Sequence, residues 1–382
     1  MSHPFFFMSK RKIIIIGTAY PYRGGLAAFN ERLAAAYIKH GDEVEIFTFT
    51  LQYPNILFPG KSQYSVDPPP KELIIHRKIN SINPFNWIKV GRQIRKKKPD
   101  VVIFAYWMWF FAPCFSAIAR FARSEQTKFI GFIHNMLPHE PSILDKIIPK
   151  MFVSKMDSFV AMAKSVADDI NRFDKKNKPK IVSPHPIYDH YGEKINTKDA
   201  LNQLGLDTNY RYILFFGIIR AYKGLDLLIE AFANFRKCND EVKLIVVGEF
   251  YEDREKYISL IQTLNLENDI ILKDEFIPDS EVNVYFGACD IVAQPYRSAT
   301  QSGVTQIAYH FEKSMLVTDV GGLAEIVPDK KVGYVVNPNP DEIADALKDF
   351  FENNRQAEFE KNILVEKEKY SWENMIEAVN AL

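Results

Sequence analysis

Residues 215–226, FFGIIRAYKGLD, join the end of an apolar run to a glycine-containing loop that carries two cations. The apolar run at residues 213–216 is typical of a buried strand. After it, Leu225, Leu228, Ile229 and Phe232 recur at helical spacing. This stretch therefore predicts a strand, a turn and a helix.

The turn has the chemistry of an anion-binding loop. Gly217 lets the backbone turn, and Gly224 lets it approach a ligand closely. Arg220 can donate two hydrogen bonds to a phosphate, and Lys223 adds a compact charge. Single Arg and Lys residues in loops are usually solvated, so the loop by itself leaves a basic surface turn open as the alternative.

Strands and helices alternate on both sides of this loop, which predicts an α/β protein with parallel sheets. The predicted strands are 13–16, 44–47, 101–104, 129–132, 159–161, 213–216, 244–247, 270–272, 291–293, 316–318 and 334–336. Residues 183–208 contain Pro184, Pro186 and Gly192 and lack an apolar stripe, so they predict a linker. We expect two doubly wound, Rossmann-like domains, 1–190 and 205–367, that face each other across a cleft, with 368–382 packing back on the first.

Composition excludes several classes of protein. Lys plus Arg and Asp plus Glu both number 48, so no global charge favours nucleic acid. The three cysteines lie far apart and form neither a metal-ligand spacing nor a disulfide framework. No apolar run approaches the roughly 20 residues of a membrane span, and the first twelve residues do not form a signal peptide. We therefore expect a cytoplasmic protein that starts at Met1 or Met8.

A second loop, residues 295–302, follows the strand 291–293 and opens a helix of about ten residues. The free backbone N–H groups at such a helix start, around Ser302, Gly303 and Val304, suit a diphosphate. Gln306, one turn into the helix, can bond ribose hydroxyls. Ser and Thr at a helix start are also common caps, which is the simpler interpretation of Ser302.

A third loop repeats the strand, turn and helix pattern at residues 318–327, with a diglycine at Gly321 and Gly322. Two adjacent glycines indicate close approach of the backbone to a ligand.

The N-terminal half offers two loops after strands. Residues 17–25 end in Gly24 and Gly25 before a helix, but they lack the Gly-x-Gly-x-x-Gly pattern of dinucleotide-binding proteins. Residues 133–140 contain His134, His139 and Glu140, without the spacing of a helical zinc motif.

Together these motifs resemble the family 4 group of retaining glycosyltransferases with the GT-B fold. Residues 217–224 match the family's Gly-x-x-x-x-x-Lys-Gly loop, and residues 319–327 match its Asp-x-Gly-Gly-x-x-Glu segment. The resemblance extends from Ile13 to the final helix. It implies an acceptor-side domain at 1–190 and a nucleotide-sugar-binding domain at 205–367.

The resemblance also implies roles for individual residues. Lys223 would contact the donor diphosphate, and Arg220 would replace the family's Arg, which usually stands where this chain has Ile218. The implied catalytic residues are His134, Arg220 and Lys223. The implied donor nucleotide and diphosphate ligands are Gly25, Gly217, Arg220, Lys223, Ser302, Gly303, Val304 and Gln306; those of the donor sugar are Gln301, Ser302, His134 and Gly322; and those on the acceptor side are Gly24, His139 and Glu140.

The chain departs from the family at its Glu-x7-Glu pair, because Ser298 and Gln306 stand where the two carboxylates are expected. A nucleotide-sugar 2-epimerase of the same architecture and a non-catalytic nucleotide-sugar binder therefore remain alternatives. No metal or other cofactor is implied, because there is no Asp-x-Asp cluster.

The expected reaction is transfer of a sugar, with retention of configuration, to a glycan or lipid-linked acceptor in bacterial cell-surface polysaccharide synthesis. Two segments raise the hypothesis of peripheral contact with the inner face of a membrane. The first is the run of cations at a helix end, for which a solvated face is the alternative: Lys89, Arg92, Arg95, Lys96, Lys97 and Lys98. The second is the aromatic run 106–111, for which core packing is the alternative.

Overall fold

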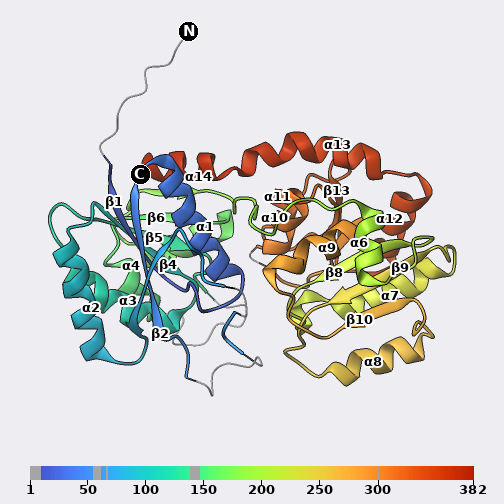
Figure 1. Cartoon of the computed structure of the whole chain (residues 1–382), viewed down its shortest axis with the longest axis horizontal. Helices are drawn as coiled ribbons and strands as arrows, with labels where there is room; N and C mark the ends of the chain where they lie inside the picture. The colour runs from blue at the N-terminus through green and yellow to red at the C-terminus, as the bar shows by residue number, and fades with distance from the viewer. Residues whose placement is uncertain (1–9, 55–61, 66–67, 138–146, 300) are drawn as a thin grey trace, which may run out of the picture. The chain divides into compact units, whose positions relative to one another are not determined.

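The computed structural model describes residues 10–54, 62–65, 68–137, 147–299 and 301–382. These residues form two compact units (Figure 1). Unit 1 contains the described residues up to Ser183 together with Met375–Leu382, and unit 2 contains Pro184–Asn374. Each unit is built around its own parallel β-sheet, with helices packed on the sheet.

Among the described residues, the sheet of unit 1 has seven strands in the order β3-β2-β1-β4-β5-β6-β7, and every pair is parallel. The strands are β1 (Lys12–Ile16), β2 (Glu43–Leu51), β3 (Ile74–Asn80), β4 (Val101–Tyr106), β5 (Lys128–Ile133), β6 (Ser158–Ala161) and β7 (Lys180–Val182). The helices are α1 (Gly25–His40), α2 (Pro84–Lys97), α3 (Ala112–Ala122), α4 (Pro149–Val153) and α5 (Lys164–Phe173).

The sheet of unit 2 has six described strands in the order β10-β9-β8-β11-β12-β13, again parallel throughout. The strands are β8 (Arg211–Phe216), β9 (Val242–Val247), β10 (Ile270–Lys273), β11 (Ile291–Gln294), β12 (Ser314–Thr318) and β13 (Gly333–Val336). The helices are α6 (Thr197–Leu204), α7 (Leu225–Arg236), α8 (Arg254–Thr263), α9 (Val282–Ala288), α10 (Gly303–His310), α11 (Leu323–Ile326), α12 (Pro340–Glu352) and α13 (Gln356–Glu366).

Every strand predicted from an apolar run is present, and each unit has its own apolar core. The central strands are buried on both faces, as β1 shows with Ile13, Ile14, Ile15 and Ile16 all fully buried. The prediction missed β3 and β7, the two edges of the sheet in unit 1. Both strands are largely uncovered, and Ile79 is the one fully buried residue of β3, so neither carries an apolar run.

The expected linker at residues 183–208 is partly wrong, because it contains helix α6. Asn196 caps this helix by accepting a hydrogen bond from the backbone N–H of Asp199 at 2.9 Å. The helix buries Ala200 and Leu201 and packs closely on α9, where a Cβ at Gly287 would lie 3.0 Å from the Cβ of Ala200. Two buried residues make too short a stripe to be recognised as helical periodicity.

The chain ends in helix α14 (Trp372–Asn380). Met375, Ile376 and Val379 are buried, and residues from Met375 onward belong to unit 1. Arg11, just before β1, donates a hydrogen bond to the side chain of Asn380 at 2.7 Å. Among the described residues, no helix is both long and apolar enough to cross a membrane.

Candidate functional site

The strand order of unit 2 reverses between β8 and β11, and this reversal determines where a ligand can enter. Strands β8 and β11 are parallel neighbours, but the chain continues from β8 to β9 on one side and from β11 to β12 on the other. In open α/β sheets, ligands bind in the crevice that opens at such a point, beyond the carboxyl ends of the strands. In this chain the loops 217–224 and 295–302 flank that point.

The structure brings predicted residues from both loops together around Gly217. This glycine has a φ of 101°, in the left-handed region that favours glycine. A Cβ built on Gly217 would lie 3.3 Å from Nζ of Lys223 and 3.8 Å from a methyl carbon of Val304. The first loop and the start of α10 therefore meet at the position expected for the diphosphate.

Lys223 is half-buried and its ammonium group has no carboxylate partner among the described residues. Nζ lies 5.3 Å from the centre of the Tyr296 ring. Burial, together with the nearby Arg220 cation, holds the pKa of Lys223 below its ordinary value. A partly desolvated cation of this kind favours an incoming anion, because the anion would replace the lost water.

Arg220 lies at the outer side of the same loop. Its side chain is exposed, and its guanidinium carbon lies 5.1 Å from the centre of the Tyr251 ring. Ile218, at the position where the family commonly has Arg, is 41% exposed. Arg220 therefore has an accessible guanidinium group in this loop, and its diphosphate contact stays a prediction.

The loops 217–224 and 295–302 are tied to each other by contacts that the sequence did not reveal. Gly224 has a φ of 66°, and a Cβ there would lie 2.0 Å from the carbonyl oxygen of Pro295. The N–H of Arg297 donates to the carbonyl of Tyr222 at 2.7 Å. The Arg297 guanidinium forms two hydrogen bonds to the Asp226 carboxylate, at 2.6 and 3.2 Å. The position of Lys223 is thus fixed by both loops.

The second predicted anion-binding element is the start of α10. Ser302 caps the helix by accepting a hydrogen bond from the N–H of Val304 at 3.2 Å, so the capping interpretation is correct for this side chain. The Ser302 hydroxyl also lies 3.1 Å from the hydroxyl of Tyr296. Burial raises the pKa of Tyr296 to about 12. The expected helix of about ten residues is eight residues long.

Gly303 packs against a residue that the sequence did not single out. A Cβ at Gly303 would lie 2.9 Å from a ring carbon of Tyr188, which is buried. The Tyr188 hydroxyl in turn lies 3.0 Å from Nε2 of His185. Tyr188 and His185 therefore support the backbone at the start of α10. No pattern in the sequence marked them, since they lie in the segment expected to be a linker.

Gln306 is fully buried in α10, and neither atom of its amide has a hydrogen-bond partner among the described residues. An unpaired buried amide costs roughly 1–3 kcal/mol. The neighbouring Gln294 is buried as well, and its carbonyl oxygen accepts a hydrogen bond of 3.4 Å from Thr305. A ribose contact at Gln306 stays a prediction and requires this side chain to become accessible. Gln301 is half-buried at the loop surface.

The third loop follows β12, the neighbour of β11 in the sheet. Gly321 adopts a φ of 54°, and the buried Gly322 immediately precedes α11. The hydroxyl of Thr318 donates to the carbonyl of Tyr296 at 2.5 Å, which links this loop to the previous one. The three predicted loops thus follow three adjacent strands, β8, β11 and β12.

Unit 1 contains the remaining predicted residues at the carboxyl ends of its strands. Gly24 and Gly25 are exposed at the start of α1, and Gly24 has a φ of 102°. The Glu31 carboxylate holds the preceding loop by accepting a 2.6 Å hydrogen bond from the N–H of Tyr20. Both glycines are therefore accessible at the N-terminus of a long helix.

His134 follows β5 and is 8% exposed. Its ring packs edge-on against Phe29 of α1, with the centres 4.7 Å apart. The backbone N–H of His134 donates to the carbonyl of Tyr106 at 2.9 Å. His134 is thus fixed between the end of β5 and α1. His139 and Glu140 lie outside the described residues.

One further observation concerns metal binding. In the part of the chain that the structure describes, no group of three or more His, Cys, Asp or Glu residues is placed to hold a metal ion. The expectation that no metal is needed stays a prediction.

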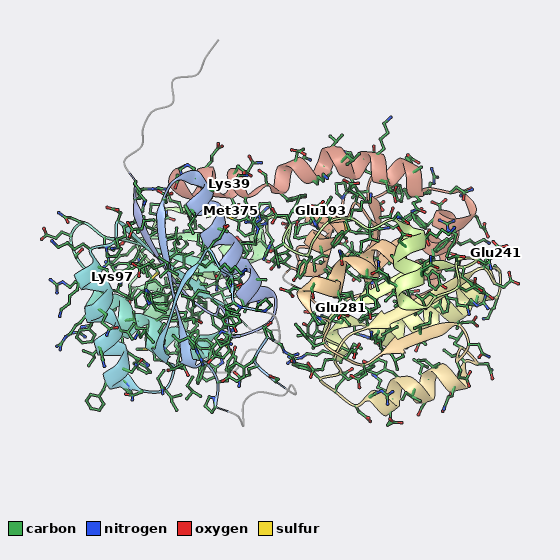
Figure 2. The ribbon with its side chains drawn as sticks, viewed as in Figure 1. Lys39, Lys97, Glu193, Glu241, Glu281 and Met375 are labelled. Atoms are coloured by element: carbon green, nitrogen blue, oxygen red, sulfur yellow. The ribbon has the colours of Figure 1, made fainter. Side chains whose placement is uncertain are left out.

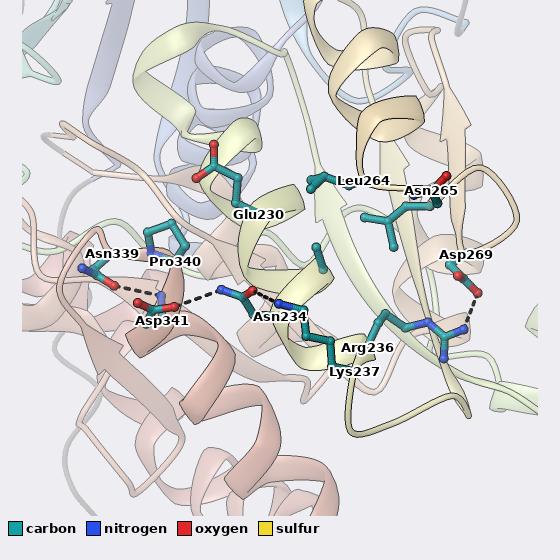
Figure 3. Close-up of a pocket in the computed structure, with 12 residues that line it drawn as sticks. Glu230, Asn234, Arg236, Lys237, Leu264, Asn265, Asp269, Asn339, Pro340 and Asp341 are labelled. Carbon is teal, nitrogen blue, oxygen red and sulfur yellow. Dashed lines mark hydrogen bonds and ion pairs between the residues drawn. The ribbon is translucent and has the colours of Figure 1, made fainter.

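A pocket in unit 2 lies away from the loops (Figure 3). It is lined by the far end of α7, where Arg236 lies about 16 Å along the helix from Leu225. Its polar groups bond one another, with Arg236 to Asp269 at 2.8 Å and Asn234 to Asp341 at 2.9 Å. This pocket is therefore not the candidate site.

Comparison with known proteins gives the same fold. A sucrose-phosphate synthase from Thermosynechococcus elongatus superposes with a TM-score of 0.76 at 16% identity, over 97% of this chain and 98% of the other. An Anabaena protein, HepE, solved in complex with UDP-glucose, superposes with a TM-score of 0.74 at 17% identity, over 97% of this chain and all of the other.

Among curated proteins, the lipopolysaccharide 1,2-N-acetylglucosaminetransferase of Salmonella typhimurium is 30% identical over 200 residues. That match covers 48% of this chain and 50% of the relative. The chain thus spans about half the length of the first curated relatives that it matches, 50% of one and 41% of the next.

Family models match both halves of the chain. The model of glycosyltransferase family 4 matches residues 23–187, and the model of glycosyl transferases group 1 matches residues 196–365. The second match lies within unit 2, and the first covers most of unit 1 and ends four residues beyond Ser183; the two-unit architecture is the GT-B fold. The chain therefore belongs to the family 4 glycosyltransferases.

Proposed function

We propose that this protein transfers a sugar from a nucleotide-diphosphate donor to an acceptor hydroxyl group. The observation that carries the proposal is the meeting of Lys223, Gly217 and Val304 beside the point where the strand order of unit 2 reverses. A half-buried cation without a carboxylate partner in the described chain lies there next to glycine backbone and a helix start. This combination suits a diphosphate better than any neutral ligand.

The proposed chemistry requires stabilisation of a departing nucleoside diphosphate. The acceptor oxygen forms a bond to the anomeric carbon as the bond from that carbon to the diphosphate oxygen breaks. The electron pair leaves with the diphosphate, and the proton of the acceptor passes to it. Fixed cations at Lys223 and Arg220 and the N–H groups at the start of α10 lower the energy of the charge that develops there.

The contacts to the donor sugar are proposed from the family resemblance. In this proposal Gln301, Ser302, Gly322 and His134 contact it. Gly25 would face the phosphates, and Gly24 would face the acceptor. Retention of configuration is part of the proposal and rests on the family resemblance.

For the acceptor we propose a glycan or a lipid-linked sugar in bacterial cell-surface polysaccharide synthesis. The support is the name of the Salmonella relative, a lipopolysaccharide N-acetylglucosaminetransferase. A lipid-linked acceptor would place the protein in the cytoplasm, at the inner face of the membrane.

Two other functions stay in view because Ser298 and Gln306 replace the family's pair of carboxylates. Without them the protein would be either a nucleotide-sugar binder or, with acid and base groups elsewhere, a 2-epimerase. The three functions differ in their products, namely sugar transferred, nothing changed, or donor isomerised.

The first test is thermal unfolding with UDP-, GDP- and ADP-sugars, because a ligand of the folded state raises the melting temperature. We expect one nucleotide class to stabilise the protein, and that donor to be consumed when acceptor glycans are added. Product analysis by mass spectrometry then identifies the transfer. Stabilisation by none of the three donor classes would contradict the proposal, as would release of an isomerised donor.

A further inference from the structure

Residues 71–98, which span β3 and α2, carry an unusual concentration of positive charge. Nine of them are Lys or Arg and one is Glu, in a chain whose formal net charge is zero. The rest of the chain is therefore net acidic. A local excess of this size produces a positive patch that acts on anionic surfaces within a Debye length, about 10 Å at 0.1 M salt.

Helix α2 presents much of this charge on one face. Phe85, Lys89, Arg92 and Lys96 follow one another at spacings of four, three and four residues, and all four are exposed. The opposite face holds the helix on unit 1 through the fully buried Val90 and Ile94. The exposed stripe is therefore not needed for packing.

The side of α2 next to α3 (Figure 1) is closely packed. A Cβ on Gly91 would lie 2.7 Å from the Cβ of Phe121 and 2.8 Å from the carbonyl of Ile118. This contact fixes the orientation of α2, and so the direction in which the stripe faces.

The cations of the stripe and its neighbours Arg95 and Lys98 are not neutralised within the described part of the chain. Five exposed residues lack an ion pair there, namely Lys89, Arg92, Arg95, Lys96 and Lys98. Lys97, labelled in Figure 2, differs from them because its Nζ pairs with Glu45 at 2.8 Å. The unpaired charges therefore remain available for an external anion.

Two large apolar side chains lie at the start of the same helix. Phe85 is 84% exposed and Ile82 is 52% exposed. The local fold does not use them, because Asn83 caps the helix and Trp87 donates to the carbonyl of Asn80 at 2.7 Å. Exposed apolar groups beside unpaired cations are the pattern of a helix that lies in a membrane interface.

We propose that the exposed face of α2, with Phe85 and Ile82 at its start, binds the surface of an anionic lipid bilayer. The cations contact lipid phosphates, and the two apolar side chains enter the boundary between headgroups and acyl chains. This proposal rests on the proposed membrane location and names the surface that would contact the membrane. It does not depend on the donor loops. A nucleic acid would pair with the cations and stack a base on Phe85, but it would leave the aliphatic side chain of Ile82 without an apolar environment.

The aromatic run 106–111 is not this surface. Trp107, Met108 and Phe110 pack on the core of unit 1, and Phe111 is fully buried. The hydroxyl of Tyr53 further accepts a hydrogen bond from the Trp107 indole at 2.8 Å. Of the two segments first associated with a membrane, the structure leaves the basic one accessible.

The test is co-sedimentation of the full chain with vesicles of phosphatidylcholine alone or with 30% phosphatidylglycerol. The test variants are K89Q/R92Q/K96Q and F85S. Their matched controls are K198Q/K348Q/K361Q, three exposed lysines of unit 2, and V365S, whose side chain is 69% exposed on α13. Thermal unfolding and nucleotide binding of each variant show that the fold and the donor site are intact.

We expect binding to the anionic vesicles alone, and a fall with increasing salt. Three charges at roughly 1 kcal/mol each correspond to a decrease on the order of 100-fold for the triple variant. F85S should weaken binding at least severalfold, and both controls should bind normally. Equal loss in test and control variants, equal binding to neutral vesicles, or tighter binding to single-stranded RNA than to vesicles would overturn the proposal. If the donor proposal failed instead, vesicle binding would be unchanged.

Discussion

Among single residues, the proposed diphosphate site depends most on Lys223. Its burial lowers its pKa, so its charge is held at a cost to the unliganded protein. Because the unfolded chain keeps the ordinary lysine pKa, this cost appears as pH falls below that value, and it is present at neutral pH. A bound diphosphate would offset this cost.

The first prediction follows from this cost. Replacing Lys223 by Met should weaken nucleoside diphosphate binding by roughly 10- to 150-fold, the value of a hydrogen bond between charged groups. The same variant should unfold at an equal or higher temperature than the wild type without ligand at neutral pH. Calorimetric titration and thermal unfolding measure the two effects.

The wild type should also lose affinity as pH rises through the lowered pKa of Lys223, while the Met variant shows no such decrease. The matched control is K237M, at the exposed far end of α7, which should leave affinity unchanged. An unchanged affinity in K223M would remove the diphosphate assignment.

The second residue-scale prediction concerns His185, below the start of α10. Its Nδ1 lies 3.2 Å from the carbonyl of Pro186, so this nitrogen donates and Nε2 accepts from Tyr188. Burial lowers the pKa of His185 to about 4. The unfolded state takes up a proton near pH 6.5 and the folded state near 4, so stability is lost as pH falls between these values.

In urea unfolding, the free energy of unfolding of the wild type should therefore fall by about 2 kcal/mol more than that of H185Q between pH 7.5 and pH 5.0. Other titrating groups contribute equally to both proteins, so the difference isolates His185. An equal loss in both would show that His185 does not titrate in this window.

Residue identities in the loops were readable from the sequence where a chemical pattern marked them, as with Gly217, Lys223 and Ser302. Contacts between distant segments could not be predicted from the sequence. Tyr188 against Gly303, or Arg297 on Asp226, depends on where the chain folds back, and neither pairing has a local signal. The unpaired amide of Gln306 was likewise invisible, since its residue type indicates a polar surface position.

At the scale of elements, the loop-to-helix junction at Gly224 is the most restrictive part of the site. Its φ of 66° and the closeness of the Pro295 carbonyl leave no room for a side chain. Replacing it by Ala should cost about 1 kcal/mol for the left-handed backbone and a further 1–3 kcal/mol for the overlap. The Ala variant should also bind nucleotide more weakly, because the two loops would separate.

The control for this prediction is Gly205, at the end of α6. It has the same φ of 66°, but a Cβ there would meet no atom within 4 Å. G205A should therefore cost about 1 kcal/mol and leave nucleotide binding intact. Chemical unfolding compares the two variants, and equal costs would show that the Pro295 contact does not constrain the loop.

Elements were predictable where burial produced a long pattern. Central strands such as β1 and β8 have continuous apolar runs because helices cover both faces. The edge strands β3 and β7 and the short helix α6 bury one or two side chains each in full at most, so they leave no periodic signal. Their stability comes from pairing or packing with neighbours, which the sequence does not display.

At the scale of the whole molecule, the alternating strands and helices predicted two doubly wound sheets, and the structure contains both. Their strand orders share one scheme, in which the first strand lies beside the fourth. The donor-side loops follow from this scheme, because the reversal between β8 and β11 opens the sheet edge where they lie. The proposed membrane surface does not follow from the fold, since it depends on side chains along one helix.

Hydrogen–deuterium exchange shows whether a nucleoside diphosphate binds at the loops after β8 and β11. Exchange should be measured with and without the nucleoside diphosphate that most stabilises the protein. Bound ligand should slow exchange in peptides covering 217–224 and 302–306 and leave those covering 230–237 and 264–269 unchanged. Slower exchange at the α7 pocket, with no change in the two loops, would show that the nucleotide does not bind at these loops.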